Sequence, residues 1–348
     1  RALAVRMAAS CGRRLDDACP VVDATLPDGT RLNAVLPPLS ADGTLICLRT
    51  KRRSAFTLGQ LVEAGTVAPG LDSVLAALIE TRASCLITGA TGTGKTTLLA
   101  ALLGLVSATE RIVCIEEAAE LRPDHPHVLH LQERGDNVQG AGAVPMSALV
   151  RTALRMRPDR IVLGECRGPE VRDVLTALNT GHEGGWATLH ANSPADVPAR
   201  LTALGALAGL DETAVAAQAV SALDAVIHLR RSGATGGGIA GRRSPREGTA
   251  ERSSTRGSDG PDSCASPEQD VMSSRSSRTR RYVSGIGMLR RGAQGSLVCE
   301  DALIVALDGA AGTVCAVSAG PAVDRLAERI GAAPVAAAMK GGTSWTPL

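Results

Sequence analysis

The sequence of 348 residues predicts an α/β fold, in which a parallel sheet follows a small α+β N-terminal domain. Three observations lead to this prediction. Apolar strands alternate with amphipathic helices between residues 71 and 231, a pattern typical of parallel α/β sheets. A glycine-rich loop joins the first of these strands to a helix. Short apolar segments separated by turn residues fill residues 1–70.

The N-terminal domain, residues 1–70, is predicted to contain three short strands and a linker helix. The turn signals Pro-Asp-Gly, Pro-Pro and Ala-Asp-Gly separate the strands at hairpin-like distances. The segment TLGQLVEAG then predicts a short helix, with Thr57 as its N-cap and Gly65 just past its end.

The second domain, residues 71–231, is predicted to hold the parallel sheet. Apolar runs predict strands at residues 84–88, 111–115, 160–164 and 186–189. A helix over 169–181 places its apolar residues on one face, and a further helix is expected after Ser193 as N-cap, with Pro194 at its first position.

The last third of the chain is less regular. Residues 232–280 contain no Leu and are rich in Ser, Gly and Arg, so they predict a disordered insertion. Residues 281–289 predict a strand that pairs with 225–231 across this insertion. The remainder of 281–348 is Ala- and Gly-rich and is expected to form a weakly patterned tail.

The segment GATGTGKTT fits the phosphate-binding pattern GxxxxGK[ST] and stands between a strand and a helix, as that pattern requires. Backbone N–H groups of such a loop converge on phosphate oxygens, aided by the helix N-terminus. Lys95 is expected to reach the β- and γ-phosphates and Thr96 to bind Mg²⁺. The predicted nucleotide-binding residues are Gly89, Ala90, Thr91, Gly92, Thr93, Gly94, Lys95, Thr96 and Thr97.

Polar residues follow the other predicted strands. Glu116 and Glu117 come after the second strand, Glu165 after the third and His190 after the fourth. Because ligands bind at the carboxyl ends of parallel strands, these side chains are expected to meet beside the phosphate loop. One carboxylate would orient the attacking water, another would hold the Mg²⁺ shell, and the imidazole would sense the γ-phosphate. Taken singly, each is also explained as a solvated loop residue or a structural histidine.

Four ordered segments resemble the motifs of the secretion ATPases of type II and type IV systems. GATGTGKTT matches their Walker A motif and RIVCIEEAAEL their Asp box, although the box usually reads Glu-Asp where this chain has Glu116-Glu117. ALVRTALRMRPDRIVLGECRGPE matches the Walker B region and TGHEGGWATLHANSP the His box. The resemblance covers roughly residues 12 to 230, resumes near Arg281, and is greatest to the tight-adherence pilus and conjugal-transfer-associated branch.

The resemblance implies a P-loop, RecA-like ATPase domain in a ring-shaped homo-oligomer, a hexamer, at the cytoplasmic face of the inner membrane. ATP with Mg²⁺ would power pilus assembly or protein secretion against an inner-membrane platform protein. It implies Glu116 as the water-orienting carboxylate and Glu165 as the Walker B acid that acts on Mg²⁺ through water. It also places His182 and His190 in the His box, with His190 on the γ-phosphate side.

The family further implies arginines that close the site from the N-terminal domain. Arg49 of the segment CLRTKRR best matches that position, with Lys51, Arg52 and Arg53 as possible substitutes, and a solvated basic turn is the alternative. Four more arginines fall in motif segments, where structural ion pairs explain them equally well: Arg134, Arg155, Arg157 and Arg167.

Composition bears on the competing functions. The net charge is +2 and aromatic residues make up 1% of the chain, which argues against nucleic-acid binding. A nucleic-acid-dependent ATPase of the conjugation or helicase type is the alternative function. A nucleotide-gated scaffold, which binds ATP but barely hydrolyses it, is the third hypothesis. The nine cysteines form no CxxC pair, so neither a disulfide framework nor a structural metal is expected. No membrane span or signal peptide is expected either.

Overall fold

The computed structural model describes residues 1–50, 55–135, 142–232, 280–307 and 314–341. The predicted insertion lies outside the described residues over 233–279, as do Lys51, Arg52 and Arg53. Within the described part of the chain, no helix combines the length and apolarity needed to cross a membrane.

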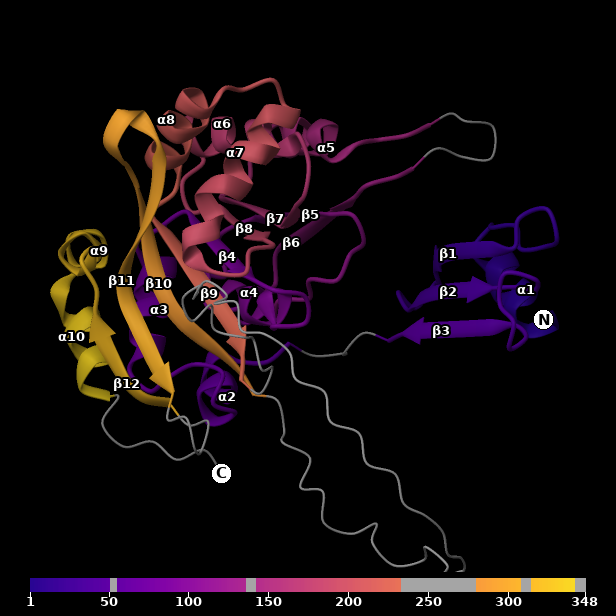
Figure 1. Cartoon of the computed structure of the whole chain (residues 1–348), viewed down its shortest axis with the longest axis horizontal. Helices are drawn as coiled ribbons and strands as arrows, with labels where there is room; N and C mark the ends of the chain where they lie inside the picture. Colours follow the sequence, from indigo (N-terminus) through magenta and orange to yellow (C-terminus); the bar gives the residue numbers. More distant parts are fainter. Residues whose placement is uncertain (51–54, 136–141, 233–279, 308–313, 342–348) are drawn as a thin grey trace, which may run out of the picture.

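The N-terminal residues form a small α+β unit, set to one side of the main body (Figure 1). Helix α1 (Ala2–Ser10) precedes a three-stranded antiparallel sheet of β1 (Val21–Thr25), β2 (Arg31–Val35) and β3 (Leu45–Arg49), in that order. Alternate residues of β1 and β2 pack against α1 in a separate apolar core. The other face of this sheet carries Arg31 and Arg49, which are register partners.

A second, larger sheet forms the main body. Among the described residues its strand order is β12-β11-β10-β9-β4-β8-β7-β5-β6. These strands are β4 (Cys85–Gly89), β5 (Ile112–Glu116), β6 (Val128–Gln132), β7 (Arg160–Cys166), β8 (Trp186–Leu189), β9 (Ala225–Arg231), β10 (Arg281–Arg291), β11 (Leu297–Leu307) and β12 (Val314–Ala319). From β9 to β6 the neighbouring strands are parallel, whereas β10, β11 and β12 are antiparallel. The sheet is therefore mixed rather than parallel throughout.

Helices cover both faces of this sheet, which explains why its central strands consist mostly of buried apolar residues. One face packs against α2 (Leu58–Glu63), α3 (Leu71–Glu80), α4 (Lys95–Leu103), α9 (Val323–Ile330) and α10 (Ala332–Gly341). The other packs against α5 (Met146–Leu154), α6 (Glu170–Asn179), α7 (Val197–Leu207) and α8 (Glu212–Ala222). Two short 3₁₀ segments, Pro194–Asp196 and Ala293–Gly295, complete the described elements.

Several sequence-based expectations are confirmed in detail. Thr57 caps α2 through a capping box with Gln60. β10 pairs with β9 antiparallel, which joins residues on either side of the predicted insertion. The helix expected after Ser193 is only partly confirmed. Ser193 and Pro194 stand at the predicted positions, but they begin a 3₁₀ segment rather than the α-helix, and the Ser193 side chain makes no capping hydrogen bond. The largest correction concerns the predicted tail, since β11, β12, α9 and α10 extend the large sheet and its core.

Candidate active site

The glycine-rich loop connects β4 to α4 in the geometry of a phosphate cradle. Gly89, Gly92 and Gly94 have φ values of 147°, 74° and 99°, which favour glycine. A Cβ on Gly89 would lie 2.5 Å from the carbonyl oxygen of Leu229, so the loop also packs tightly against β9. Helix α4 begins at Lys95, which directs its first free N–H groups towards the loop.

Lys95 is buried and extends towards β8. Its Nζ donates hydrogen bonds to the carbonyl oxygens of Gly89 (2.9 Å) and Ala90 (3.2 Å) and lies 3.3 Å from Nδ1 of His190. Burial lowers the pKa of the Lys95 ammonium, while the nearby Glu165 carboxylate acts in the opposite direction. The ammonium is thus already positioned between the phosphate loop and the end of β8.

His190 links Lys95 to Glu165. Its Nε2 lies 2.6 Å from Oε1 of Glu165. Because an ammonium only donates, Nδ1 of His190 accepts in its contact with Lys95. Burial and then the Lys95 charge lower the pKa of His190, and Glu165 opposes them. The imidazole thus lies between an ammonium and a carboxylate that shift its pKa in opposite directions.

Glu165 in β7 also connects to the Asp-box loop through Arg167. Oε2 of Glu165 lies 2.7 Å from Nη2 of Arg167, and Nη1 of Arg167 donates to Glu117 at 2.8 Å. The same hydrogen bond to Glu165 raises the pKa of Arg167. Of the four arginines drawn from the motif segments, Arg167 is the one that the structure brings into this site.

Glu116 at the end of β5 is buried, with 3% of its surface exposed. Its Oε1 accepts hydrogen bonds from the backbone N–H groups of Glu120 and Leu121, both at 2.9 Å. Its Oε2 has no hydrogen-bond partner among the described residues, and Nδ1 of His130 lies 3.8 Å away. Gly164 makes room for this side chain, since a Cβ there would lie 2.6 Å from Cγ of Glu116. One oxygen is therefore anchored and the other is left to accept a hydrogen bond.

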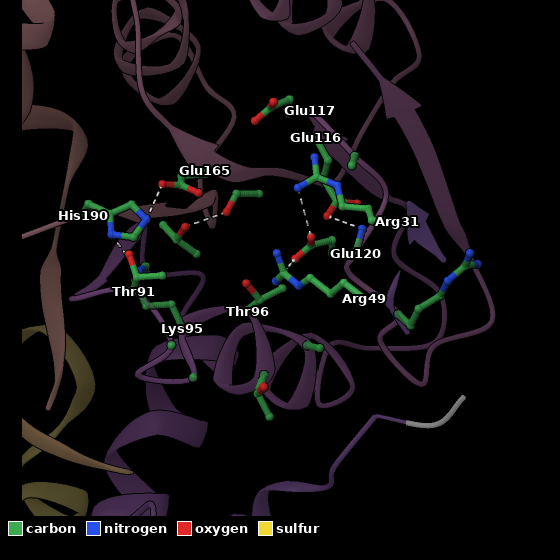
Figure 2. Close-up of a pocket in the computed structure, with 18 of the residues that line it drawn as sticks. Arg31, Arg49, Thr91, Lys95, Thr96, Glu116, Glu117, Glu120, Glu165 and His190 are labelled. Atoms are coloured by element: carbon green, nitrogen blue, oxygen red, sulfur yellow. Dashed lines mark hydrogen bonds and ion pairs between the residues drawn. The ribbon is translucent and has the colours of Figure 1, made fainter. Parts of the chain in front are cut away.

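Two arginines reach the site from the small domain (Figure 2). Nη2 of Arg49 donates to Oε2 of Glu120 at 3.1 Å, and Nη1 of Arg31 lies 3.8 Å from Oε1 of the same carboxylate. The sequence reading identified Arg49 but missed Arg31. The pairing of the β2–β3 hairpin could have identified Arg31, because it places residue 31 of β2 opposite residue 49 of β3.

These groups line one cavity of about 450 Å³ between the two domains. Of the predicted site residues, the ones that line it are Arg49, Thr91, Gly92, Gly94, Lys95, Thr96, Thr97, Glu116, Glu165 and His190. Gly89, Ala90 and Thr93 instead shape the loop behind it, where the Thr93 hydroxyl donates to the Ala90 carbonyl. Phe56 and Ala100 give the cavity an apolar part.

Some motif residues lie elsewhere. His182 and Arg134 do not line the cavity. Arg155 and Arg157 line a separate surface pocket with Arg111 and His127. Their motif positions therefore did not indicate proximity to the phosphate loop.

The oxygen donors beside the loop fit a magnesium ion that arrives with a nucleotide. Mg²⁺ is usually held by one or two protein oxygens together with phosphate oxygens and water. Thr96 and Glu165, which both line the cavity, would supply such oxygens.

Residues 1–274 match the family described as "Type II/IV secretion system protein". The chain belongs to this family. Together with the intact phosphate loop, this membership identifies an ATP-hydrolysing enzyme and confirms the resemblance drawn from the four motifs.

Curated relatives include a putative conjugal transfer protein of Mycobacterium tuberculosis, 52% identical over 237 residues, or 66% of this chain and 67% of the relative. The type IV secretion system protein PtlH of Bordetella pertussis is 37% identical over 227 residues, covering 58% of this chain and 66% of PtlH. The matches thus span about two thirds of each relative. Among solved structures, the pilus retraction motor PilT with bound ADP is similar at 25% identity and a TM-score of 0.46, with 62% and 60% of the two chains covered.

Proposed function

We propose that the chain uses Mg²⁺-dependent ATP hydrolysis to power pilus assembly or protein secretion, as a subunit of a ring-shaped homo-oligomer at the inner face of the cell membrane. Convergence of Lys95, Glu165, His190 and Arg49 from separate elements on one cavity carries this proposal. The resemblance to tight-adherence ATPases supports the pilus branch, with an inner-membrane platform protein as partner.

The chemistry assigned to each residue follows from its position. Lys95 and the loop N–H groups would hold the β- and γ-phosphates. Thr96 and, through water, Glu165 would hold Mg²⁺, which would neutralise phosphate charge. The free Oε2 of Glu116 accepts a hydrogen bond from the attacking water and orients it. Water attack on the γ-phosphorus breaks its bond to the β–γ bridging oxygen, which leaves as ADP. His190 contacts Lys95 and Glu165, so it would respond to the presence or absence of the γ-phosphate.

Arginines of the small domain supply the remaining positive charge. Arg49, with Arg31 beside it, neutralises charge that develops on the γ-phosphate, an effect worth roughly 10³ to 10⁵ in rate for arginine fingers. Both now bind Glu120 of their own chain. In a ring they would serve the nucleotide at a subunit boundary, so full activity would depend on assembly.

The proposal is tested by measuring ATP turnover per chain against protein concentration, with Mg²⁺ and no nucleic acid. A steep rise with concentration, together with a larger mass, supports a site completed by assembly. Constant turnover by a chain shown by light scattering to be monomeric at every concentration would contradict the ring. Absence of nucleotide binding at all concentrations would contradict the ATPase itself.

A nucleic-acid-dependent ATPase is the second candidate, favoured by the conjugal transfer name of a relative. The net charge of +2 and the scarcity of aromatic residues argue against it. Turnover that rises severalfold on addition of single- or double-stranded DNA would favour this second function.

A further inference from the structure

The paired ends of β9 and β10 lie directly beside the phosphate loop. Arg231, the last residue of β9, is the register partner of Arg281, the first residue of β10. Ser232 and Arg280 close this end, since the backbone N–H of Ser232 donates to the Arg280 carbonyl at 2.8 Å and the N–H of Arg280 donates to the Ser232 hydroxyl at 3.1 Å. The backbone of the two arginines is thus held at a fixed place on the sheet.

Both side chains lie against glycines of the phosphate loop. A Cβ placed on Gly92 would lie 3.7 Å from Nη1 of Arg231, and one on Gly94 would lie 3.7 Å from Cδ of Arg281. Arg281 also lines the cavity that contains Lys95. A guanidinium on this loop therefore comes within reach of any phosphate that the loop holds.

These arginines differ in their partners from Arg31, Arg49 and Arg167, whereas Arg122, which also lines the cavity, likewise forms no ion pair with a described residue. Arg49 and Arg31 lie against Glu120, and Arg167 pairs with Glu117 and Glu165. Neither Arg231 nor Arg281 forms an ion pair with a described residue, and both are exposed. Two guanidiniums without carboxylate partners beside a phosphate cradle raise the local positive potential, which favours an anion.

The strand order decides which part of a nucleotide these arginines would meet. β4 leads into the loop and lies between β8 and β9. Lys95 turns towards His190 at the end of β8, so the γ-phosphate chemistry lies on that side. Arg231 and Arg281 lie on the β9 side, away from the group that is hydrolysed.

We propose that Arg281, with Arg231 beside it, binds the α- and β-phosphates of the nucleotide held by the phosphate loop of the same chain. This inference rests on the proposed ATPase function. It adds two positively charged side chains on the β9 side of the nucleotide-binding site. Arg281 contributes to binding both ADP and ATP, whereas Arg49 acts on the γ-phosphate and therefore distinguishes the two.

The test is isothermal titration calorimetry of the full chain with Mg-ADP and with a non-hydrolysable ATP analogue. One lost charge-assisted hydrogen bond corresponds to about tenfold in affinity. Arg281→Gln is expected to weaken both ligands about tenfold and by the same factor, and Arg281→Lys is expected to recover part of the loss. Arg230→Gln is the matched control, because alternation along β9 places its side chain on the other face.

Unchanged affinity for ADP in Arg281→Gln and in the double variant with Arg231→Gln would overturn the inference. A loss confined to the ATP analogue, or an equal loss in Arg230→Gln, would also overturn it. If the unaltered chain binds neither ligand, the proposed ATPase function fails and this inference fails with it. If the unaltered chain binds and hydrolyses ATP, the variants test only the role assigned to Arg281 and Arg231.

Discussion

Gly164 is predicted to be required for turnover because it leaves space for Glu116. An added Cβ would lie 2.6 Å from Cγ and 3.3 Å from Oε1 of Glu116, whereas ordinary contacts are 3.4–4 Å. Glu116 must therefore move by about 1 Å in Gly164→Ala. A shift of that size weakens both backbone hydrogen bonds to Oε1, and a 1 Å misplacement at a catalytic site costs on the order of 10²-fold in rate. Overpacking of this kind also lowers the free energy of unfolding by about 1–3 kcal/mol.

The assay compares kcat for ATP hydrolysis, ADP affinity and urea unfolding. We expect kcat to fall about 100-fold while ADP affinity changes little, because Gly164 is not part of the phosphate loop. Gly59→Ala is the matched control, since Gly59 is exposed on α2 and an added Cβ meets only Thr57 Oγ1 at 3.9 Å. It should leave kcat unchanged and raise stability by up to about 1 kcal/mol. Unaltered kcat in Gly164→Ala would refute the assignment of Glu116.

Three further predictions concern charge. Glu165→Gln should retain ATP binding and lose turnover, measured by calorimetry and phosphate release, and normal turnover would contradict its role at the metal. Arg49→Gln should reduce kcat by at least 100-fold with ADP affinity unchanged, and an equal loss for ADP would contradict a γ-phosphate role. Burial and then Arg230 lower the pKa of His228 to about 4, from 6.5 when unfolded. Between these values only the unfolded chain binds the proton, so stability falls by roughly 2 kcal/mol from pH 7 to pH 5. Urea unfolding at both pH values should show this loss, and His228→Gln should reduce it.

The sequence predicted the central strands and the phosphate loop because both have local signatures. The strands β4, β5 and β8 are buried along their whole length, so each is a short, mostly apolar run in the sequence. The loop needs glycines at left-handed positions followed by Lys95, a pattern that requires no knowledge of the rest of the chain.

The missed elements have weaker local patterns because only part of each is buried. β6 lies at the edge of the sheet and is half exposed, with His130 interrupting its apolar residues. β11 carries charged residues in its first half, where Glu300 pairs with Arg290 of β10. Each is specified by pairing with a neighbouring strand rather than by its own composition, so periodicity within the segment could not establish it.

The candidate site shows the same division between local and tertiary information. The sequence predicted Glu116, Glu165 and His190 one by one, each at the end of a strand. Their proposed roles depend on a continuous set of contacts across the sheet. Lys95 meets His190, His190 meets Glu165, and Arg167 joins Glu165 to Glu117. These contacts follow the strand order β4-β8-β7-β5, which differs from the order along the chain. A sequence motif can identify the residues of such a site. The order of the strands in the sheet decides which of their side chains touch, and therefore which charged groups interact.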